Sequence, residues 1–148
     1  MMDRDAFFRP IAHRGLHNAR KGIIENTEPA FSAAIAKGYG IECDLRPASG
    51  GLPIVFHDET LNRLADGKGP VSRLDAQDLK RLRYKASDTR IMSFAELLEA
   101  ERETACAHRV LTYVAGHPTA RGRIQDDLRR QLAKLPTTSA ELSWPELE

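Results

Sequence analysis

The sequence predicts an α/β fold with parallel strands, and three features within residues 11–45 carry this prediction. A short apolar segment at residues 11–12 runs directly into His13 and Arg14. A helical pattern follows, and the apolar run 41–45 comes after it with only a short link. A strand, a helix and a second strand in this order form a βαβ unit, whose two strands are expected to be parallel neighbours.

Length and charge limit the class of protein. The chain has 148 residues, which suits one domain with a sizeable core. Lys and Arg number 22 against 21 Asp and Glu, and a net charge of +1 gives no electrostatic reason to expect a nucleic-acid partner. The Arg-rich segment 121–130 also contains Asp126 and Asp127, so we interpret it as a solvated helix face.

Cysteine usage and the first residues bear on location. Cys43 and Cys106 are too few for a disulfide framework and form no Cys-x-x-Cys pair, so reduced thiols and a cytoplasmic location are expected. The first five residues are charged and no long apolar run follows them. We therefore expect neither a signal peptide nor a membrane span.

The first helix and the turn after the acidic strand have clear local signals. Thr27 is the predicted N-cap of a helix of about three turns that stops near Gly38. Ser49-Gly50-Gly51 predicts a turn, so that residues 44–48 and 52–56 form a hairpin. Such a hairpin returns the chain to the neighbourhood of the acidic strand.

Two later helices are expected to be packing elements without a role in chemistry, and a further strand follows them. Asp75 is the predicted cap of one helix. Ser93 and Glu96 match a capping box at the start of a second. Residues 110–114, Val-Leu-Thr-Tyr-Val, predict a further strand.

Two carboxylates two residues apart are the first chemical signal. In a strand, Glu42 and Asp44 share one face, while Ile41, Cys43 and Leu45 face the other way. Two carboxylates on one face repel unless a positive charge lies between them, and a hard divalent cation prefers oxygen ligands. The alternative is an ordinary half-buried strand whose acidic residues face solvent.

His13 and Arg14 are candidate functional residues because they follow the first strand. Arg binds phosphate through its forked donors, and His transfers protons near neutral pH. Glu25 precedes the first helix, and His57 with Asp58 follows the hairpin. Chemistry in βα folds collects at the carboxyl ends of strands, where these residues and the acidic pair are expected to meet. Each has a structural alternative, such as a helix-dipole role for the glutamate.

Four short segments therefore hold the residues with chemical potential. They are His13-Arg14-Gly15, Glu25-Asn26-Thr27, Glu42-x-Asp44, and His57-Asp58 followed by Leu61 and Arg63. In order and approximate spacing this set resembles the glycerophosphodiester phosphodiesterase family. The resemblance implies a (β/α)8 TIM barrel and metal-dependent hydrolysis of a small-molecule glycerophosphodiester to an alcohol and glycerol 3-phosphate.

The resemblance also implies roles for individual residues. His13 and His57 resemble the family's general acid/base pair, and Arg14 resembles its phosphate ligand. Glu42 and Asp44 resemble ligands of Mg²⁺ or Ca²⁺, with Glu25 lining the site as a less certain member of the set. These roles suit the chemistry of a phosphodiester, whose oxygens need positive charge and whose leaving alcohol needs a proton.

The sequence departs from the family in its last third. A TIM barrel needs about 250 residues, so we expect this chain to supply only the first two or three βα units. The family's third carboxylate is expected near residues 110–114, which contain no acid. We therefore divide the chain into 1–100, the family-like part, and 101–148, a divergent strand-helix segment with a loose tail.

This departure leaves a second functional hypothesis open. The chain is either a phosphodiesterase or a truncated, catalytically inactive relative that keeps a phosphate-binding rim. An incomplete barrel leaves strand edges unpaired, which predicts self-association.

Overall fold

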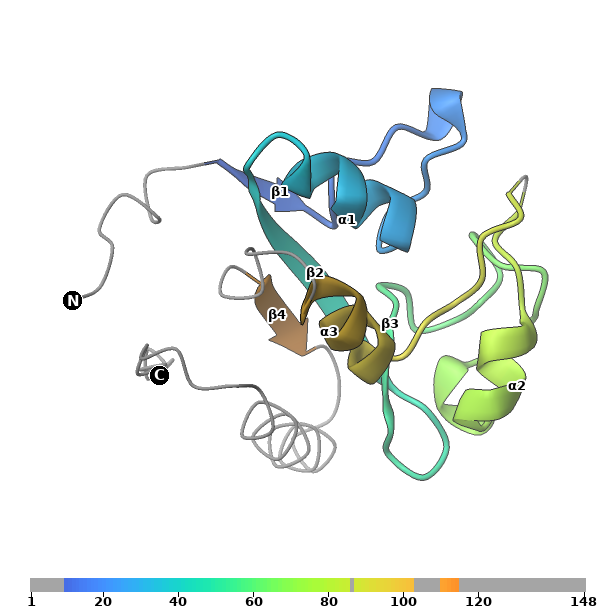
Figure 1. Cartoon of the computed structure of the whole chain (residues 1–148). Coiled ribbons are helices and arrows are strands. Elements are labelled where there is room, and N and C mark those ends of the chain that lie inside the picture. The colour runs from blue at the N-terminus through green and yellow to red at the C-terminus, as the bar shows by residue number, and fades with distance from the viewer. Residues whose placement is uncertain (1–9, 86, 103–109, 115–148) are drawn as a thin grey trace.

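The structure is a computed structural model that describes residues 10–85, 87–102 and 110–114. In this part of the chain the strands form one sheet around the long strand β2 (Figure 1). The strands are β1 (Ile11–His13), β2 (Gly40–Pro47), β3 (Pro53–Val55) and β4 (Val110–Val114). The helices are α1 (Glu28–Ile35), α2 (Ala76–Arg81) and α3 (Phe94–Arg102), with two 3-10 turns, η2 (Ala19–Lys21) and η3 (Val71–Arg73).

Strand β2 lies at the centre of the sheet, and its neighbours differ in direction. β1 and β4 run parallel to it, whereas β3 runs antiparallel. Ile41 pairs with residues of both β1 and β4, and Leu45 pairs with residues of both β3 and β4. Because a strand has two edges, β1 and β3 must lie end to end along the edge of β2 opposite β4. The predicted βαβ unit, the predicted hairpin and the predicted strand at residues 110–114 are therefore confirmed.

Helix α1 begins where the sequence indicates, but its details differ from the prediction. Thr27 is the N-cap residue, yet its hydroxyl donates to the carbonyl oxygen of Ile24 (2.6 Å) and caps no backbone N–H of the helix. The helix ends at Ile35, after 8 residues and before the expected third turn is complete. Gly38 then adopts a φ of 68°, the left-handed conformation that commonly follows a helix.

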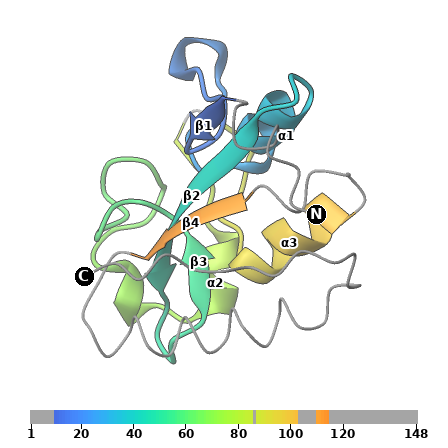
Figure 2. The ribbon, with the colours of Figure 1, turned by 90° about the vertical axis from the view of Figure 1, so that its left-hand side faces the viewer.

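The two faces of β2 have opposite character, as the alternation predicts. Ile41, Cys43 and Leu45 are buried, and they pack in one apolar cluster with residues of α1 and α3. Figure 2 shows both helices on the same side of β2. Glu42 and Asp44 lie at the intervening positions and face the other side of the sheet. The cluster contains Ala12, Phe31, Ala34, Ile41, Cys43, Leu45, Val55, Phe94, Leu97 and Leu98.

A second apolar cluster supports the hairpin and the loop after it. It includes Ile54 of β3, Phe56 directly after that strand, and Leu79 of α2. It also includes Tyr84, whose ring centroid lies 6.0 Å from that of Phe56. The predicted caps are confirmed: Asp75 accepts the Asp78 N–H, as an N-cap side chain does. Ser93 and Glu96 bond reciprocally at the start of α3. In this part of the chain no helix has both the length and the apolarity to span a membrane.

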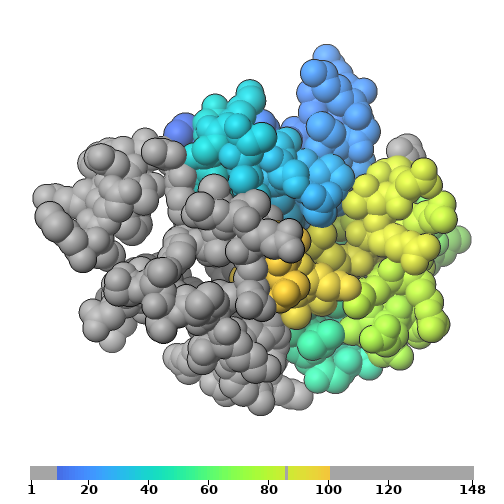
Figure 3. Space-filling model, viewed as in Figure 1, coloured from blue at the N-terminus to red at the C-terminus, as the bar shows by residue number. Residues whose placement is uncertain are grey.

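Gly15 lets the loop after β1 approach helix α1 closely. Its φ is 77°, and a Cβ built on it would lie 2.8 Å from the backbone carbonyl carbon of Ala30. The adjacent Leu16 N–H donates to the carbonyl oxygen of Ala30 (2.8 Å). The close approach that the glycine permits is therefore to the helix. By contrast, the η2 turn projects from the body of the molecule, and Gly22 beside it has a φ of 73° with nothing near its missing Cβ (Figure 3).

We predict that Gly15→Ala lowers the free energy of unfolding by about 2–5 kcal/mol, because it adds a steric overlap with backbone to the cost of a positive φ. Gly22→Ala is the matched control, since it carries only the positive-φ cost of about 1–2 kcal/mol. Urea denaturation followed by circular dichroism measures both. Equal losses in the two variants would show that the contact with Ala30 is unimportant.

Candidate active site

The first part of the site lies where β1 ends beside β2. His13 is paired with Glu42 in the parallel register, so the two side chains share one face of the sheet. The His13 Nε2 atom lies 3.9 Å from Glu42 Oε2, and the His13 side chain is 70% exposed. The structure therefore brings one predicted imidazole next to one predicted metal ligand, with solvent access to the imidazole.

Arg14 has an unusual backbone conformation that is held from two sides. Its φ is 57°, which costs a non-glycine residue about 1–2 kcal/mol. The Arg14 N–H donates to Glu42 Oε2 (3.0 Å), and the Arg14 carbonyl accepts the Asn26 N–H (2.9 Å). Such strained residues persist only where their surroundings fix them, and they are concentrated at functional sites.

The Arg14 guanidinium lies between two predicted metal-site carboxylates. Nη1 donates to Glu25 Oε1 (3.0 Å), and Nε lies 3.1 Å from Asp44 Oδ2. The Nε–H is buried and poorly aligned with Asp44, so this second contact is an ion pair rather than a hydrogen bond. Arg14 thus balances negative charge that would otherwise make the two carboxylates repel each other.

Asp44 is a buried carboxylate whose position is set by Asn26. Both residues are almost completely buried, at 3% and 1% exposure. The Asn26 Nδ2 donates to Asp44 Oδ2 (3.0 Å), and the Asp44 N–H donates to Asn26 Oδ1 (3.1 Å). Asn26 has a φ of 55°, a conformation that Asn tolerates better than most residues. This paired contact ties the loop before α1 to the centre of β2.

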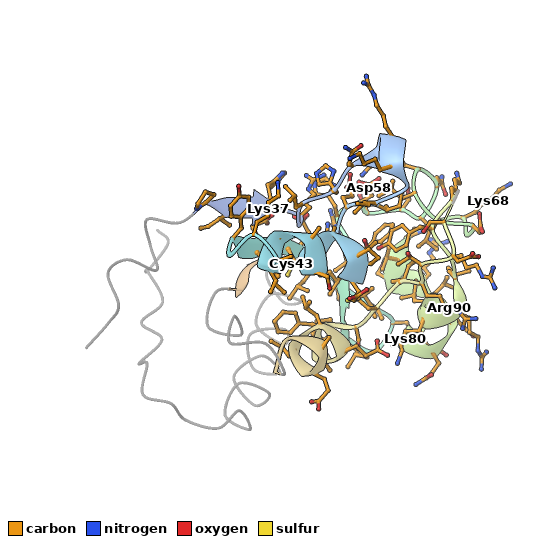
Figure 4. All side chains as sticks on the ribbon, turned by 45° about the horizontal axis from the view of Figure 1, so that its top comes forward. Lys37, Cys43, Asp58, Lys68, Lys80 and Arg90 are labelled. Atoms are coloured by element: carbon orange, nitrogen blue, oxygen red, sulfur yellow. The ribbon has the colours of Figure 1, made fainter. Side chains whose placement is uncertain are left out.

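The second imidazole belongs to a connected group of charges after β3. His57 Nδ1 lies 2.8 Å from Asp58 Oδ1, and Arg63 binds both oxygens of Asp58, with Nε and Nη2 at 2.7 and 2.8 Å. Arg63 also donates to both oxygens of Glu25, at 2.9 and 3.3 Å. In Figure 4 Asp58 lies at the top of the view, well apart from Lys80 and Arg90.

These contacts perturb the acidities of the group. The hydrogen bonds from Arg63 lower the pKa of Asp58 to about 2, despite an opposing effect of burial. Burial alone would raise the pKa of Glu25, but hydrogen bonds and charge from Arg63 and Arg14 lower it below its usual value. The hydrogen bonds to Asp58 and Glu25 raise the pKa of Arg63. All three groups are therefore charged near neutral pH.

Two groups of residues are candidates for a cation site, and an arginine side chain already contacts at least one carboxylate in each, Arg63 in the first and Arg14, through Asp44, in the second. Among the described residues, Glu25, His57 and Asp58 present ligand atoms within 4.8 Å of one another. Arg63 already neutralises both carboxylates of that group. Glu42 and Asp44 project from one face of β2, and their oxygen donors suit a hard divalent cation. This donor set fits the metal that the sequence analysis expects.

The structure brings all the predicted site residues into one connected region. His13 lies beside Glu42, and Glu42 accepts the Arg14 N–H. The Arg14 side chain contacts both Asp44 and Glu25. From Glu25 the contacts continue through Arg63 and Asp58 to His57. Two members have no role in the sequence analysis, Asn26 and Arg63. Both belong to the quoted motifs, but no local pattern indicates that they bind carboxylates 18 and 38 residues away.

Comparison with known proteins identifies the family. Residues 13–139 match the model of the Glycerophosphoryl diester phosphodiesterase family. The chain is 40% identical over 73 residues to a glycerophosphodiester phosphodiesterase of Caldanaerobacter subterraneus, which covers 49% of this chain and 29% of that protein. It is 35% identical over 118 residues to glycerophosphodiester phosphodiesterase 1 of Rattus norvegicus, and this match covers 72% of this chain and 34% of that protein. The chain belongs to the glycerophosphodiester phosphodiesterase family.

The chain spans about a third of the length of these curated relatives. The family match extends beyond residue 100, where the sequence analysis placed the end of the family-like part. Apart from the end of α3 and strand β4, residues 101–148 lie outside the described residues, so the division at residue 100 stays a prediction.

Solved structures show the fold. A phosphodiesterase of Oleispira antarctica, in complex with the product sn-glycerol-3-phosphate, superposes with a TM-score of 0.72 at 20% identity, covering 90% of this chain and 56% of that one. A glycerophosphodiester phosphodiesterase of Thermotoga maritima superposes with a TM-score of 0.63 at 24% identity, covering 85% of this chain and 50% of that one. The predicted fold class is confirmed: the parallel strands β1, β2 and β4 form part of an α/β barrel of the TIM type.

We predict that Asn26→Ala lowers the free energy of unfolding by about 2–4 kcal/mol, because it leaves the buried Asp44 N–H without an acceptor. Asn62→Ala is the matched control: Asn62 Oδ1 also accepts a backbone N–H, from Gly69 (2.9 Å), but in an exposed setting. We expect that variant to lose about 1 kcal/mol or less. Urea denaturation measures both, and similar losses would contradict a structural role for the Asn26–Asp44 pair.

Proposed function

We propose that this chain hydrolyses glycerophosphodiesters to an alcohol and glycerol 3-phosphate with the help of Mg²⁺ or Ca²⁺. The main support is the continuous set of contacts around Arg14, through which four separate segments place two imidazoles, two arginines and four carboxylates in one region. Family membership supports the same reaction. The substrate would then be a small molecule. We propose that the chain acts on it in the cytoplasm.

Glu42 and Asp44 would hold the divalent cation, with Glu25 as the less certain third ligand. A bound cation supplies positive charge that neutralises the phosphate oxygens as the bond to the alcohol breaks. Asp44 is ready for this role because Asn26 fixes its carboxylate, and fixed ligands lose little entropy on binding. Glu42 adds a second oxygen donor that already contacts the Arg14 N–H.

Arg14 would bind the phosphate, and the two imidazoles would transfer protons. The Arg14 guanidinium is only 19% exposed and is held by Glu25 and Asp44, so it is oriented before substrate arrives. One imidazole, of His13 or His57, takes a proton from the nucleophile, which is water or the substrate's own glycerol hydroxyl. In the second case a cyclic phosphate forms first, and water then opens it to glycerol 3-phosphate. The other imidazole gives a proton to the departing alcohol oxygen.

A second candidate function is an inactive relative that binds phosphate with the same residues. Strand β4 favours it, because Leu111 and Tyr113 occupy the register positions beside Glu42 and Asp44, where the family resemblance leads us to expect a third carboxylate.

Ile11 supports the expected self-association of the chain. This apolar side chain is 50% exposed and lies on the same face of β1 as His13.

We predict that the chain releases glycerol 3-phosphate from glycerophosphocholine, and that a chelator abolishes this release. His13→Ala and Asp44→Asn should each lower chelator-sensitive activity by at least about 100-fold, because each removes a group required in the transition state. A coupled assay for glycerol 3-phosphate measures the rates, and circular dichroism checks that both variants remain folded.

Two matched variants control this experiment. His17→Ala removes an exposed imidazole from the η2 loop, and Asp88→Ala removes an exposed carboxylate, so both should keep full activity. Binding of inorganic phosphate without turnover in the wild type would favour the inactive relative. Chelator-sensitive activity that survives both site substitutions would overturn the assignments.

A further inference from the structure

Arg63, which lies outside the predicted catalytic set, forms four hydrogen bonds to two carboxylates. Its Nε and Nη2 bind the two oxygens of Asp58 as a fork, and its Nη1 and Nη2 bind the two oxygens of Glu25. Paired contacts of this kind fix direction as well as distance, because the guanidinium is planar. Arg63 thus joins the loop after β3 to the loop before α1, across 38 residues of sequence.

The first consequence concerns the proton on His57. Asp58 accepts two N–H groups from Arg63, so it acts as a carboxylate without a proton of its own. The His57 Nδ1 atom, 2.8 Å from Asp58 Oδ1, must then carry the proton of that hydrogen bond. In a neutral imidazole this leaves Nε2 without a proton and able to accept one.

The second consequence concerns Arg14. Glu25 Oε1 accepts from both Arg63 Nη2 and Arg14 Nη1, at 2.9 and 3.0 Å. Without Arg63, the Glu25 carboxylate would lose one of the two groups that hold its direction. Since Arg14 is the proposed phosphate ligand, the same guanidinium that orients His57 also steadies the phosphate-binding residue.

We propose that Arg63 is a positioning residue: it holds Asp58 against His57 so that the imidazole keeps its proton on Nδ1, and it holds Glu25 against Arg14. This inference rests on the proposed function, because it assigns Arg63 a part in that reaction. The hydrogen bonds of Arg63 go to Asp58 and Glu25, so it acts on the imidazole and on Arg14 through these two carboxylates. Its partner Asp58 could otherwise be taken, together with His57, for a ligand of a cation, but the Arg63 guanidinium already supplies positive charge beside that carboxylate.

The direct test is the tautomer of His57, measured by nitrogen NMR of the protein labelled with ¹⁵N-histidine. At alkaline pH, where imidazoles are neutral, the wild type should show His57 with its proton on Nδ1. Arg63→Ala should shift His57 toward the Nε2–H form that free imidazoles favour. A histidine tautomer that is unchanged in Arg63→Ala would overturn the inference.

Two further variants make the NMR result specific. Arg83→Ala is the matched control, since Arg83 is 52% exposed against 49% for Arg63 and also binds a carboxylate, that of Asp88. It should leave the His57 tautomer unchanged; a shift of the same size in this variant would contradict a specific role for Arg63. Arg63→Lys keeps the charge but not the fork, so we expect only partial retention of the wild-type tautomer, and complete retention would contradict the argument from geometry.

Kinetics then connects the position of His57 to the reaction. Arg63→Ala should lower kcat about 10- to 100-fold, the usual cost of removing a residue that orients a functional side chain. Added guanidinium should restore part of the loss, whereas a merely structural defect would not respond. An unchanged kcat would overturn the inference even if the tautomer moves. A wild-type chain without turnover would count against the proposed function, and the tautomer measurement would still decide the role of Arg63.

Discussion

Four carboxylates converge on one region of this molecule, and their mutual repulsion is the constraint on which the arrangement of the site depends. Glu42 and Asp44 come from β2, Glu25 from the loop before α1, and Asp58 from the loop after β3. Two arginines balance them: Arg14 contacts Glu25 and Asp44, and Arg63 contacts Glu25 and Asp58. Glu25 is the carboxylate that both arginines share, so it links the two halves of the region. Removing either arginine would leave like charges at short range in a partly buried setting, which is costly.

The packing of the fold places this region on the face of β2 opposite the helices. The apolar face of that strand packs against α1 and α3, so Glu42 and Asp44 are directed to the opposite face. Asn26 then ties the start of α1 to Asp44, and the strained Arg14 backbone is held between Glu42 and Asn26. The packing of the sheet and two left-handed residues therefore set where the carboxylates lie, and the two arginines offset the repulsion among them.

Much of this could be predicted from local sequence, and the failures have physical causes. The βαβ unit, the faces of β2 and the caps at Asp75 and Ser93 follow from periodicity and short-range hydrogen bonding, which sequence records directly. The Thr27 hydroxyl caps no helix N–H and donates to the Ile24 carbonyl instead, a contact set by the path of the preceding loop, which the N-cap pattern does not encode. The contact of Arg63 with Glu25 depends on how two loops meet in space, and no spacing along the chain expresses that.

The central claim is that Glu42 and Asp44 of β2 hold the cation, while Asp58, bound to Arg63, orients the His57 imidazole. Isothermal titration of Mg²⁺ and Ca²⁺ into the wild type, Glu42→Gln and Asp58→Asn tests this claim most directly. We predict at least tenfold weaker binding for Glu42→Gln and a change of less than about threefold for Asp58→Asn. Loss of binding in Asp58→Asn together with wild-type affinity in Glu42→Gln would contradict the account.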